Sequence, residues 1–270
     1  MRLYDGCILP RLTDLAMRLR ILQDFRQRTL SRAEGAVLEL GFGSGLNLPF
    51  YNPRRVSRLF ALEPAAALLR LAQERIQEAR FPVEVLQTGA ERIPLPDHSV
   101  DTALCTWTLC TIPNVEAALD ETRRVLKPNG RFLFAEHGRS DEPGIARWQD
   151  RLTPAWKRFA GGCHLNRNPE SLLKGAGFDV EQIDKTYIGW FKPITYMYVG
   201  RAAPRARFAT WVPESDASAA CMRPAGTSRR FHTRLPGGGS LALCNWGNLP
   251  CRIRRSLRVR PPRNGRQVAP

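Results

Sequence analysis

A glycine-rich turn and an acidic residue are the groups in this sequence best placed for chemistry. The apolar run 37–40 ends at Gly41, and further glycines follow at Gly43 and Gly45. Glycine suits a turn that needs a positive φ and a backbone that passes close to a ligand. Glu63 ends a second apolar run, 22 residues after Gly41, near the spacing at which a carboxylate accepts hydrogen bonds from ribose hydroxyls. The pattern predicts a pocket for a nucleotide-type cofactor, and an ordinary strand-to-helix turn without a ligand is the alternative.

The position of the third glycine separates two cofactor classes. A dinucleotide fingerprint, G-x-G-x-x-G, requires glycine at position 46, where this sequence has Leu46. Glu39 lies two residues before Gly41, and a carboxylate there favours a cationic ligand and repels a pyrophosphate. The G-x-G-x-G pattern resembles motif I of class I S-adenosylmethionine-dependent methyltransferases, whose cofactor carries an ammonium and a sulfonium but no phosphate.

The elements that must position these groups alternate between apolar runs and helical patterns, which predicts a doubly wound α/β sheet with helices on both faces. Asn114 and Asn168 are expected to cap the two later helices, and Pro193 indicates that the last strand lies at an edge or starts late. The predicted strands cover 37–40, 57–62, 83–87, 100–106, 131–136, 178–184 and 194–200, and the predicted helices cover 8–30, 64–80, 115–126 and a segment starting at 169.

Three segments are expected around and within this sheet. Residues 1–34 are predicted to form an N-terminal helical cap, 35–200 the cofactor-binding domain, and 138–167 an aromatic-rich lid insertion near the ligand. From residue 201 the chain has 14 Arg, no Lys and two acidic residues, so this tail carries +12 of the net charge of +16. We expect 201–270 to be a disordered Arg/Pro/Gly-rich tail without a chemical role, for which an altered reading frame is one origin. A nucleic-acid-binding arm is the alternative.

The N-terminal helix is basic and amphipathic, with Leu12, Leu15 and Leu19 at helical spacing. It can lie on an anionic membrane surface or cap the cofactor cleft with its arginines in solvent, and we favour the cap. The seven cysteines are odd in number and contain no C-x-x-C pair, so their spacing predicts neither a metal site nor a disulfide framework. The sequence contains no run of about 18 apolar residues, so no membrane span is predicted. We therefore expect a cytoplasmic protein, with peripheral membrane contact through the N-terminal helix as an option.

Further motifs along the chain, together with the glycine turn, make the resemblance more specific. The chain resembles the UbiE-like, type 11 branch of class I methyltransferases through Glu39-x-Gly41-x-Gly43-x-Gly45-x-Asn47, Gly89-Ala90-Glu91-Arg92-Ile93-Pro94-Leu95-Pro96-Asp97 and Val125-Leu126-Lys127-Pro128-Asn129-Gly130. It is also similar to a group of membrane-associated alkyl thiol methyltransferases through Asn47-Leu48-Pro49-Phe50-Tyr51, Cys105-Thr106-x-x-x-Cys110, Ala135-Glu136-His137, Pro154-Ala155-Trp156 and Gly162-Cys163-x-Leu165-x-Arg167.

The resemblance implies a Rossmann-like, seven-stranded, mostly parallel sheet with an antiparallel last strand, and S-adenosyl-L-methionine as the cofactor. It also implies which residues bind that cofactor: Glu39, Gly41, Gly43 and Gly45 around its amino acid part, Glu63 at the ribose, Ala90 and Glu91 at the adenine, and Thr106 beside it. Asn47 is expected to be a further cofactor-binding residue. Many relatives have an aspartate where this chain has Gly89, so the backbone or Glu91 must contact the adenine. A plain helix-start carboxylate is the alternative role for Glu91.

Methyl transfer from a sulfonium mainly requires an aligned nucleophile and exclusion of water. If a base is needed, His137 is the best candidate, because it follows the fifth strand and titrates in the useful range; a structural histidine is the alternative. Tyr4, Cys110, His164 and Tyr187 are weaker candidates.

The acceptor class is predicted from motifs that are missing. After the fourth strand the sequence reads Cys105-Thr106-Trp107-Thr108, where adenine and cytosine methyltransferases carry other motifs. We therefore expect a small-molecule or lipid acceptor, namely a thiol, a quinone-like ring or a lipid head group, and disfavour nucleic acid. A cofactor-binding protein without catalysis is the second alternative.

Overall fold

The structure is a computed structural model that describes residues 4–205. The predicted tail lies outside the described residues, apart from 201–205. Of those five, residues 201–204 belong to the last strand of the sheet and do not start a separate segment. Strand β7 therefore runs four residues past the predicted boundary.

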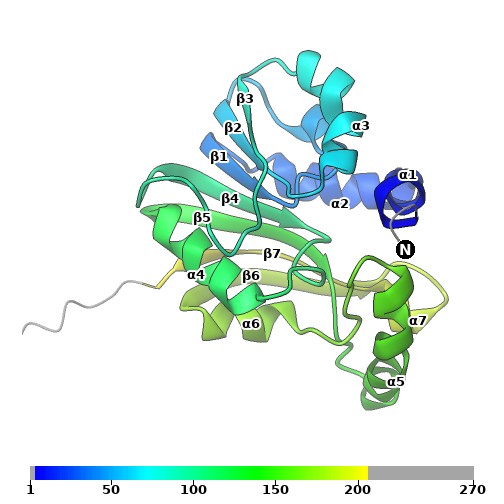
Figure 1. The fold of residues 1–270 in the computed structure, drawn as a ribbon. Helices are drawn as coiled ribbons and strands as arrows, with labels where there is room; N and C mark the ends of the chain where they lie inside the picture. Colours follow the sequence, from blue (N-terminus) through cyan, green and yellow to red (C-terminus); the bar gives the residue numbers. More distant parts are fainter. Residues whose placement is uncertain (1–3, 206–270) are drawn as a thin grey trace, which may run out of the picture. The chain divides into compact units, whose positions relative to one another are not determined.

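Seven strands form one sheet, in the order β3-β2-β1-β4-β5-β7-β6 (Figure 1). β1 to β5 pair in parallel, whereas β7 is antiparallel to both β5 and β6. The predicted Rossmann-like sheet with an antiparallel last strand is confirmed. The strands are β1 (Gly35–Leu40), β2 (Val56–Leu62), β3 (Val83–Leu86), β4 (Val100–Thr106), β5 (Leu126–His137), β6 (Phe178–Tyr187) and β7 (Tyr196–Pro204).

Helices cover both faces of the sheet. Successive residues of a strand point to opposite faces, so the apolar side chains on each face pack against a different set of helices. Leu38 of β1 packs in the core cluster that holds Leu119 of helix α4 and Leu173 of helix α6. Its neighbour Val37 packs in the cluster that holds Leu30 of α2 and Ala72 of α3. The α-helices are α1 (Leu9–Ala16), α2 (Arg20–Leu30), α3 (Ala66–Gln77), α4 (Val115–Val125), α5 (Pro143–Phe159), α6 (Pro169–Gly175) and α7 (Lys192–Thr195), with a π-helix at Tyr4–Ile8 and a 3-10 helix at Leu48–Phe50.

The two predicted caps are confirmed. Asn114 Oδ1 accepts a hydrogen bond from the backbone N–H of Ala117 at the start of α4. Asn168 Oδ1 accepts one from Ser171 at the start of α6. Pro193 lies in the short helix α7, and β7 starts after it, inside the sheet. Of the two options for the last strand, the late start is therefore right and the edge position is wrong.

The N-terminal segment differs most from the prediction. The expected single helix over 8–30 is broken at residues 17–19, because Leu19 has an extended backbone (φ −53°, ψ 135°) before α2. Leu12, Leu15 and Leu19 are 52%, 68% and 59% exposed, whereas Asp14 is buried. The apolar spacing of α1 therefore marks a surface face, and tertiary contacts of a charged residue hold the helix.

Two further boundaries move for local reasons. Pro64 precedes the N-cap of α3, so the helix starts at Ala66 and not at the proline. β5 already begins at Leu126, and its pairing with β4 is irregular between Val100 and Thr102. Residues 127–130 lie at that irregularity, between Leu126, which pairs with Val100, and Arg131, which pairs with Thr102.

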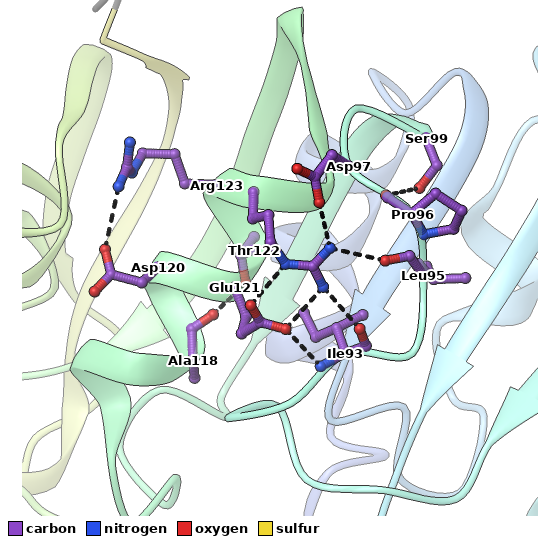
Figure 2. A network of polar contacts seen from close by, with 11 residues as sticks. Ile93, Leu95, Pro96, Asp97, Ser99, Ala118, Asp120, Glu121, Thr122 and Arg123 are labelled. Atoms are coloured by element: carbon purple, nitrogen blue, oxygen red, sulfur yellow. Dashed lines mark hydrogen bonds and ion pairs between the residues drawn. The ribbon is translucent and has the colours of Figure 1, made fainter. Parts of the chain in front are cut away.

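An arginine of α4 fixes the segment between β3 and β4. Arg124 donates to the carbonyl oxygens of Ile93 and Leu95 and to the carboxylates of Asp97 and Glu121. Figure 2 shows how these groups surround one guanidinium. This segment contains the predicted Ala90–Glu91 pair, and the network holds the part downstream of that pair against α4.

Candidate active site

One cavity of about 500 Å³ lies at the carboxyl ends of the central strands. Ligands bind at this edge in open α/β sheets, and the volume is typical of a small-molecule site. Its walls come from the turn after β1, the ends of β2, β4 and β5, helix α1 and the end of α5 with the segment that follows it. The cavity has a glycine-lined half and a cysteine- and histidine-lined half.

The glycine turn forms the floor of the first half. Gly41, Gly43 and Gly45 have φ values of +67°, +60° and +78°, which confirms the conformation predicted from their spacing. A Cβ on Gly41 would collide with the side chain of Thr108, whereas a Cβ on Gly43 would meet only the Gly41 carbonyl oxygen, at 3.9 Å. Gly41 is therefore required by the fold itself, and Gly43 by its backbone conformation.

Glu63 lies at the end of β2 and faces this turn. Its two carboxylate oxygens accept hydrogen bonds from the backbone N–H groups of Gly43 and Ala65, both at 2.9 Å. Burial raises the pKa of Glu63, while these two donors oppose the increase. Each oxygen retains a free lone pair, so the carboxylate can accept further hydrogen bonds from a ligand in the cavity.

Asn47 connects Glu39 to the cavity. Asn47 Nδ2 donates to Glu39 Oε1 at 2.8 Å and to Thr106 Oγ1 at 2.9 Å, and its Oδ1 accepts from Arg26 Nε at 2.9 Å. Tyr51 donates its hydroxyl to Glu39 Oε2 at 2.6 Å. Both amide hydrogens of Asn47 are thus used within the protein, and this side chain orders the cavity wall.

Burial controls the charge state of this network. Glu39 is fully buried, and desolvation raises its pKa to about 7 although Tyr51, Asn47 and Arg26 stabilise the carboxylate. Burial also lowers the pKa of Arg26 to about 10, so the guanidinium stays charged near neutrality. It lies 4.9 Å above the ring of Trp107. The Arg26 side chain lines the cavity. Among the described residues, only Asn47 accepts a hydrogen bond from its guanidinium.

Helix α1 is attached to the glycine turn through a buried carboxylate. Asp14 accepts a hydrogen bond from Ser44 Oγ at 2.6 Å and pairs with Arg75 of α3 at 3.4 Å. Arg75 also donates to the Ser44 carbonyl oxygen. This contact places Leu9, Pro10 and other residues of α1 in the cavity wall.

The second half of the cavity holds a cysteine–histidine cluster. His137 Nε2 lies 3.1 Å from Cys163 Sγ, and Trp156 Nε1 donates to the same sulfur at 3.3 Å. Hydrogen bonds from Cys110 and His137 lower the pKa of Cys163 to about 4. Burial lowers the pKa of His137, but the hydrogen bond and charge of Cys163 outweigh it and raise that pKa overall. The two shifts are reciprocal, because each partner favours the charged form of the other.

The structure distributes the predicted site residues unevenly. Gly41, Gly43, Asn47, Glu63, Thr106 and His137 line the cavity, whereas Glu39, Gly45, Ala90 and Glu91 do not. Glu91 Oε1 instead accepts from the backbone N–H of Asn114. Of the weaker candidates, Cys110 lines the cavity, and His164 and Tyr187 do not. Sequence reasoning missed Arg26 and Cys163 as cavity groups, and it missed Asp14 as the residue that attaches α1 to the glycine turn. The only signal for Cys163 was a motif shared with thiol methyltransferases.

The sequence of this chain is similar to those of known methyltransferases. A family model described as a methyltransferase domain matches residues 38–134. The human thiol S-methyltransferase TMT1A is 35% identical over 147 residues, which cover 53% of this chain and 59% of that protein. A ubiquinone/menaquinone biosynthesis C-methyltransferase from Methylobacterium nodulans is 38% identical over 86 residues, covering 31% of this chain and 34% of that protein.

The fold comparison extends over more of the chain. The solved structure of the Bacillus YcgJ protein superposes with a TM-score of 0.54 at 18% identity, over 69% of this chain and 99% of that one. The similarity supports the fold. Among residues 4–205, no helix combines the length and the apolar character needed to cross a bilayer.

Proposed function

Because the chain belongs to the class I S-adenosylmethionine-dependent methyltransferases of the UbiE-like type, we propose that it methylates a small apolar thiol. The human thiol S-methyltransferase supports this acceptor class. Since this chain spans 59% of that relative's length, both the activity and the acceptor are part of the proposal.

A single observation carries it: one cavity connects the glycine turn to the His137–Cys163 pair. A methyl donor over Gly41 and Gly43 and an acceptor beside His137 would share this space. About 500 Å³ for both partners favours a small acceptor over a macromolecule. Trp107 and Trp156 also line the cavity, and such apolar walls exclude the water that would compete for the methyl group.

Two charged residues suit the two ends of the cofactor. Glu63 would accept hydrogen bonds from the ribose hydroxyls, because its oxygens face the glycine turn and retain lone pairs. Arg26 would hold the cofactor carboxylate, because its charged guanidinium lines the cavity beside that turn. Glu39 acts on the same end indirectly, by fixing Asn47.

Methyl transfer in this site forms a bond between the acceptor sulfur and the methyl carbon. The bond between that carbon and the cofactor sulfonium breaks, and the cofactor leaves as a neutral thioether. The acceptor must first lose its thiol proton to solvent, because a thiolate is the nucleophile. The protein contributes alignment and exclusion of water, and His137 is the residue that we assign to the acceptor end.

The proposal is tested with the full chain and tritiated S-adenosylmethionine. Small alkyl thiols should become labelled, whereas quinols, lipid amines and nucleic acids should not. Arg26→Lys keeps the charge but loses the planar fork, so we expect cofactor affinity to fall about tenfold to 100-fold. Arg28→Lys, on the same helix and outside the cavity lining, is the matched control. Labelling of RNA or a quinol in preference to thiols, or cofactor binding without transfer to any acceptor, would refute the proposed activity.

An anionic membrane surface is a second proposed partner. Leu12, Leu15 and Leu19 are more than half exposed, with exposed arginines among them at positions 11, 18 and 20. A basic face with apolar side chains suits the headgroup boundary of a bilayer, and α1 also lines the cavity.

Co-sedimentation with phosphatidylglycerol vesicles tests this contact. Leu12→Ser with Leu15→Ser should weaken binding at least tenfold, whereas Val85→Ser, which alters an exposed apolar residue on β3, should not. Equal binding by the two variants would exclude α1 as the contact.

A further inference from the structure

Three potential metal ligands meet in the acceptor half of the cavity. Cys110 follows β4, His137 ends β5, and Cys163 follows α5. One ligand atom from each lies within 4.8 Å of the others. All three side chains line the cavity. Their separation in the sequence explains why cysteine spacing predicted no metal site: the sheet assembles this one from three segments.

The donor set is characteristic of a soft divalent cation. Two thiolates and one imidazole are ligands of Zn²⁺, with bond lengths of about 2.0 to 2.3 Å. Ligand atoms at those distances around one ion lie roughly 3 to 4 Å apart, which the present cluster reaches with small side-chain movements. Two thiolates neutralise the ion's charge, so the site can be occupied in a largely apolar cavity.

The surroundings of the cluster support binding as well. Trp156 Nε1 donates to Cys163 Sγ, and donors of this kind orient ligands and tune their basicity. Both cysteine ligands would bind as thiolates, so binding the ion would release any thiol proton that they carry.

We propose that Cys110, His137 and Cys163 bind Zn²⁺ and leave its fourth position open toward the cavity, where it takes the acceptor thiol. The acceptor part rests on the proposed function, and the metal site does not. Three protein ligands and an open position are the pattern of a catalytic zinc site. The thiol would lose its proton to solvent and bind as a thiolate; its sulfur then forms the bond to the methyl carbon and leaves the ion as a thioether. His137 would act as a ligand in this arrangement, and a separate base is unnecessary.

Cobalt substitution tests the metal site without any acceptor. The reduced full chain, freed of metal by a chelator, is titrated with Co²⁺ and followed by absorption. We expect one equivalent to bind with a thiolate-to-cobalt charge-transfer band and tetrahedral ligand-field bands, and Zn²⁺ to displace it. Cys110→Ser, Cys163→Ser and His137→Asn should each weaken Zn²⁺ binding about 100-fold or more. Trp156→Phe, which leaves all three ligands in place, should weaken it about tenfold. Cys7→Ser, at an exposed cysteine outside the cluster, is the control.

The outcomes separate this inference from the proposed function. Absence of the charge-transfer band, or equal Zn²⁺ affinity in Cys163→Ser and Cys7→Ser, overturns the metal site; thermal unfolding of each variant shows that it is folded. A small alkyl thiol should shift the cobalt spectrum, and an unchanged spectrum overturns the acceptor role of the ion. A shifted spectrum without methyl transfer supports the inference and refutes the proposed function.

Discussion

The charge of Glu39 should determine how stability depends on pH. Its carboxyl is fully buried with a pKa raised to about 7 by desolvation. Glu39→Gln removes the charge and keeps the shape. The glutamine oxygen can still accept from Asn47, and its amide can donate to the Tyr51 hydroxyl. The substitution therefore isolates the effect of ionisation.

The direction in which stability changes with pH follows from the raised pKa of Glu39. Below pH 4.5 the carboxyl is protonated in both folded and unfolded chains, and its contribution to stability is fully present. As the pH rises toward 7, the unfolded chain ionises first, so wild type loses stability relative to the variant. Between the ordinary value of 4.5 and about 7, at about 1.4 kcal/mol per pH unit, the total loss is about 3 kcal/mol.

Denaturant unfolding at pH 5 and pH 8 measures this loss. The free energy of unfolding of wild type minus that of Glu39→Gln should fall by about 2 to 3 kcal/mol between the two pH values. Other titrating groups cancel in this difference because both proteins contain them. Glu84→Gln, at an exposed position on β3, should show no such change. If the difference for Glu39→Gln is the same at both pH values, the carboxyl is ionised throughout and the reasoning fails.

Three further substitutions test contacts that hold the site. Arg124→Ala should lower the free energy of unfolding by about 1 to 3 kcal/mol in denaturant melts, because it leaves two backbone carbonyls and two carboxylates without their donor. Arg123→Ala should lower it less, because Arg123 forms one ion pair, at 3.4 Å. A larger loss in Arg123→Ala than in Arg124→Ala would contradict the role of the Arg124 network. Gly41→Ala should lower the free energy of unfolding by about 2 to 4 kcal/mol, because of the positive φ at this position and the collision with Thr108. Gly144→Ala on α5, with open space around it, should not destabilise the chain. Equal melting temperatures for the Gly41→Ala and Gly144→Ala variants would refute this prediction. Asp14→Asn should weaken the hydrogen bond to Ser44 and the ion pair with Arg75. Proteolytic cleavage before α2 should then become severalfold faster. An unchanged cleavage rate would show that other contacts hold α1.

The sheet could be predicted because its signals are local. Buried parallel strands are rich in apolar residues, and the structure places β4 at the predicted residues 100–106 although Asp101 interrupts the apolar run. Asn114 and Asn168 cap their helices where side-chain chemistry alone would put them. The positive φ values of the glycine turn follow from its composition in the same way.

The N-terminal helix could not be predicted from the same kind of signal. Apolar residues at helical spacing normally mark a buried face, yet Leu12 and Leu15 are exposed and Asp14 is buried. Ser44 and Arg75, from the glycine turn and α3, decide that orientation. Neither residue is near Asp14 in the sequence, so no local pattern contains the information.

The cysteine–histidine cluster was hidden for a related reason. His137 was a candidate because it follows a strand, but its neighbour Cys163 lies 26 residues later and beyond α5. Only the pairing of the strands and the return of the chain after α5 bring the two together. Glu39 was predicted as a cofactor contact, and the structure places Asn47 between it and the cavity, an arrangement that spacing does not reveal.

The antiparallel pairing of β7 has a consequence for synthesis of the chain on the ribosome. β7 lies between β5 and β6, and His137 at the end of β5 is paired with Met197. The strand that carries His137 is therefore exposed on one side until about 60 further residues have been made. A nascent chain that has not yet released residues up to Pro204 has an open sheet edge, which is prone to pairing with other chains. The wall of the cavity that His137 provides is therefore fixed only after the hairpin of β6 and β7 has been made and has paired with β5.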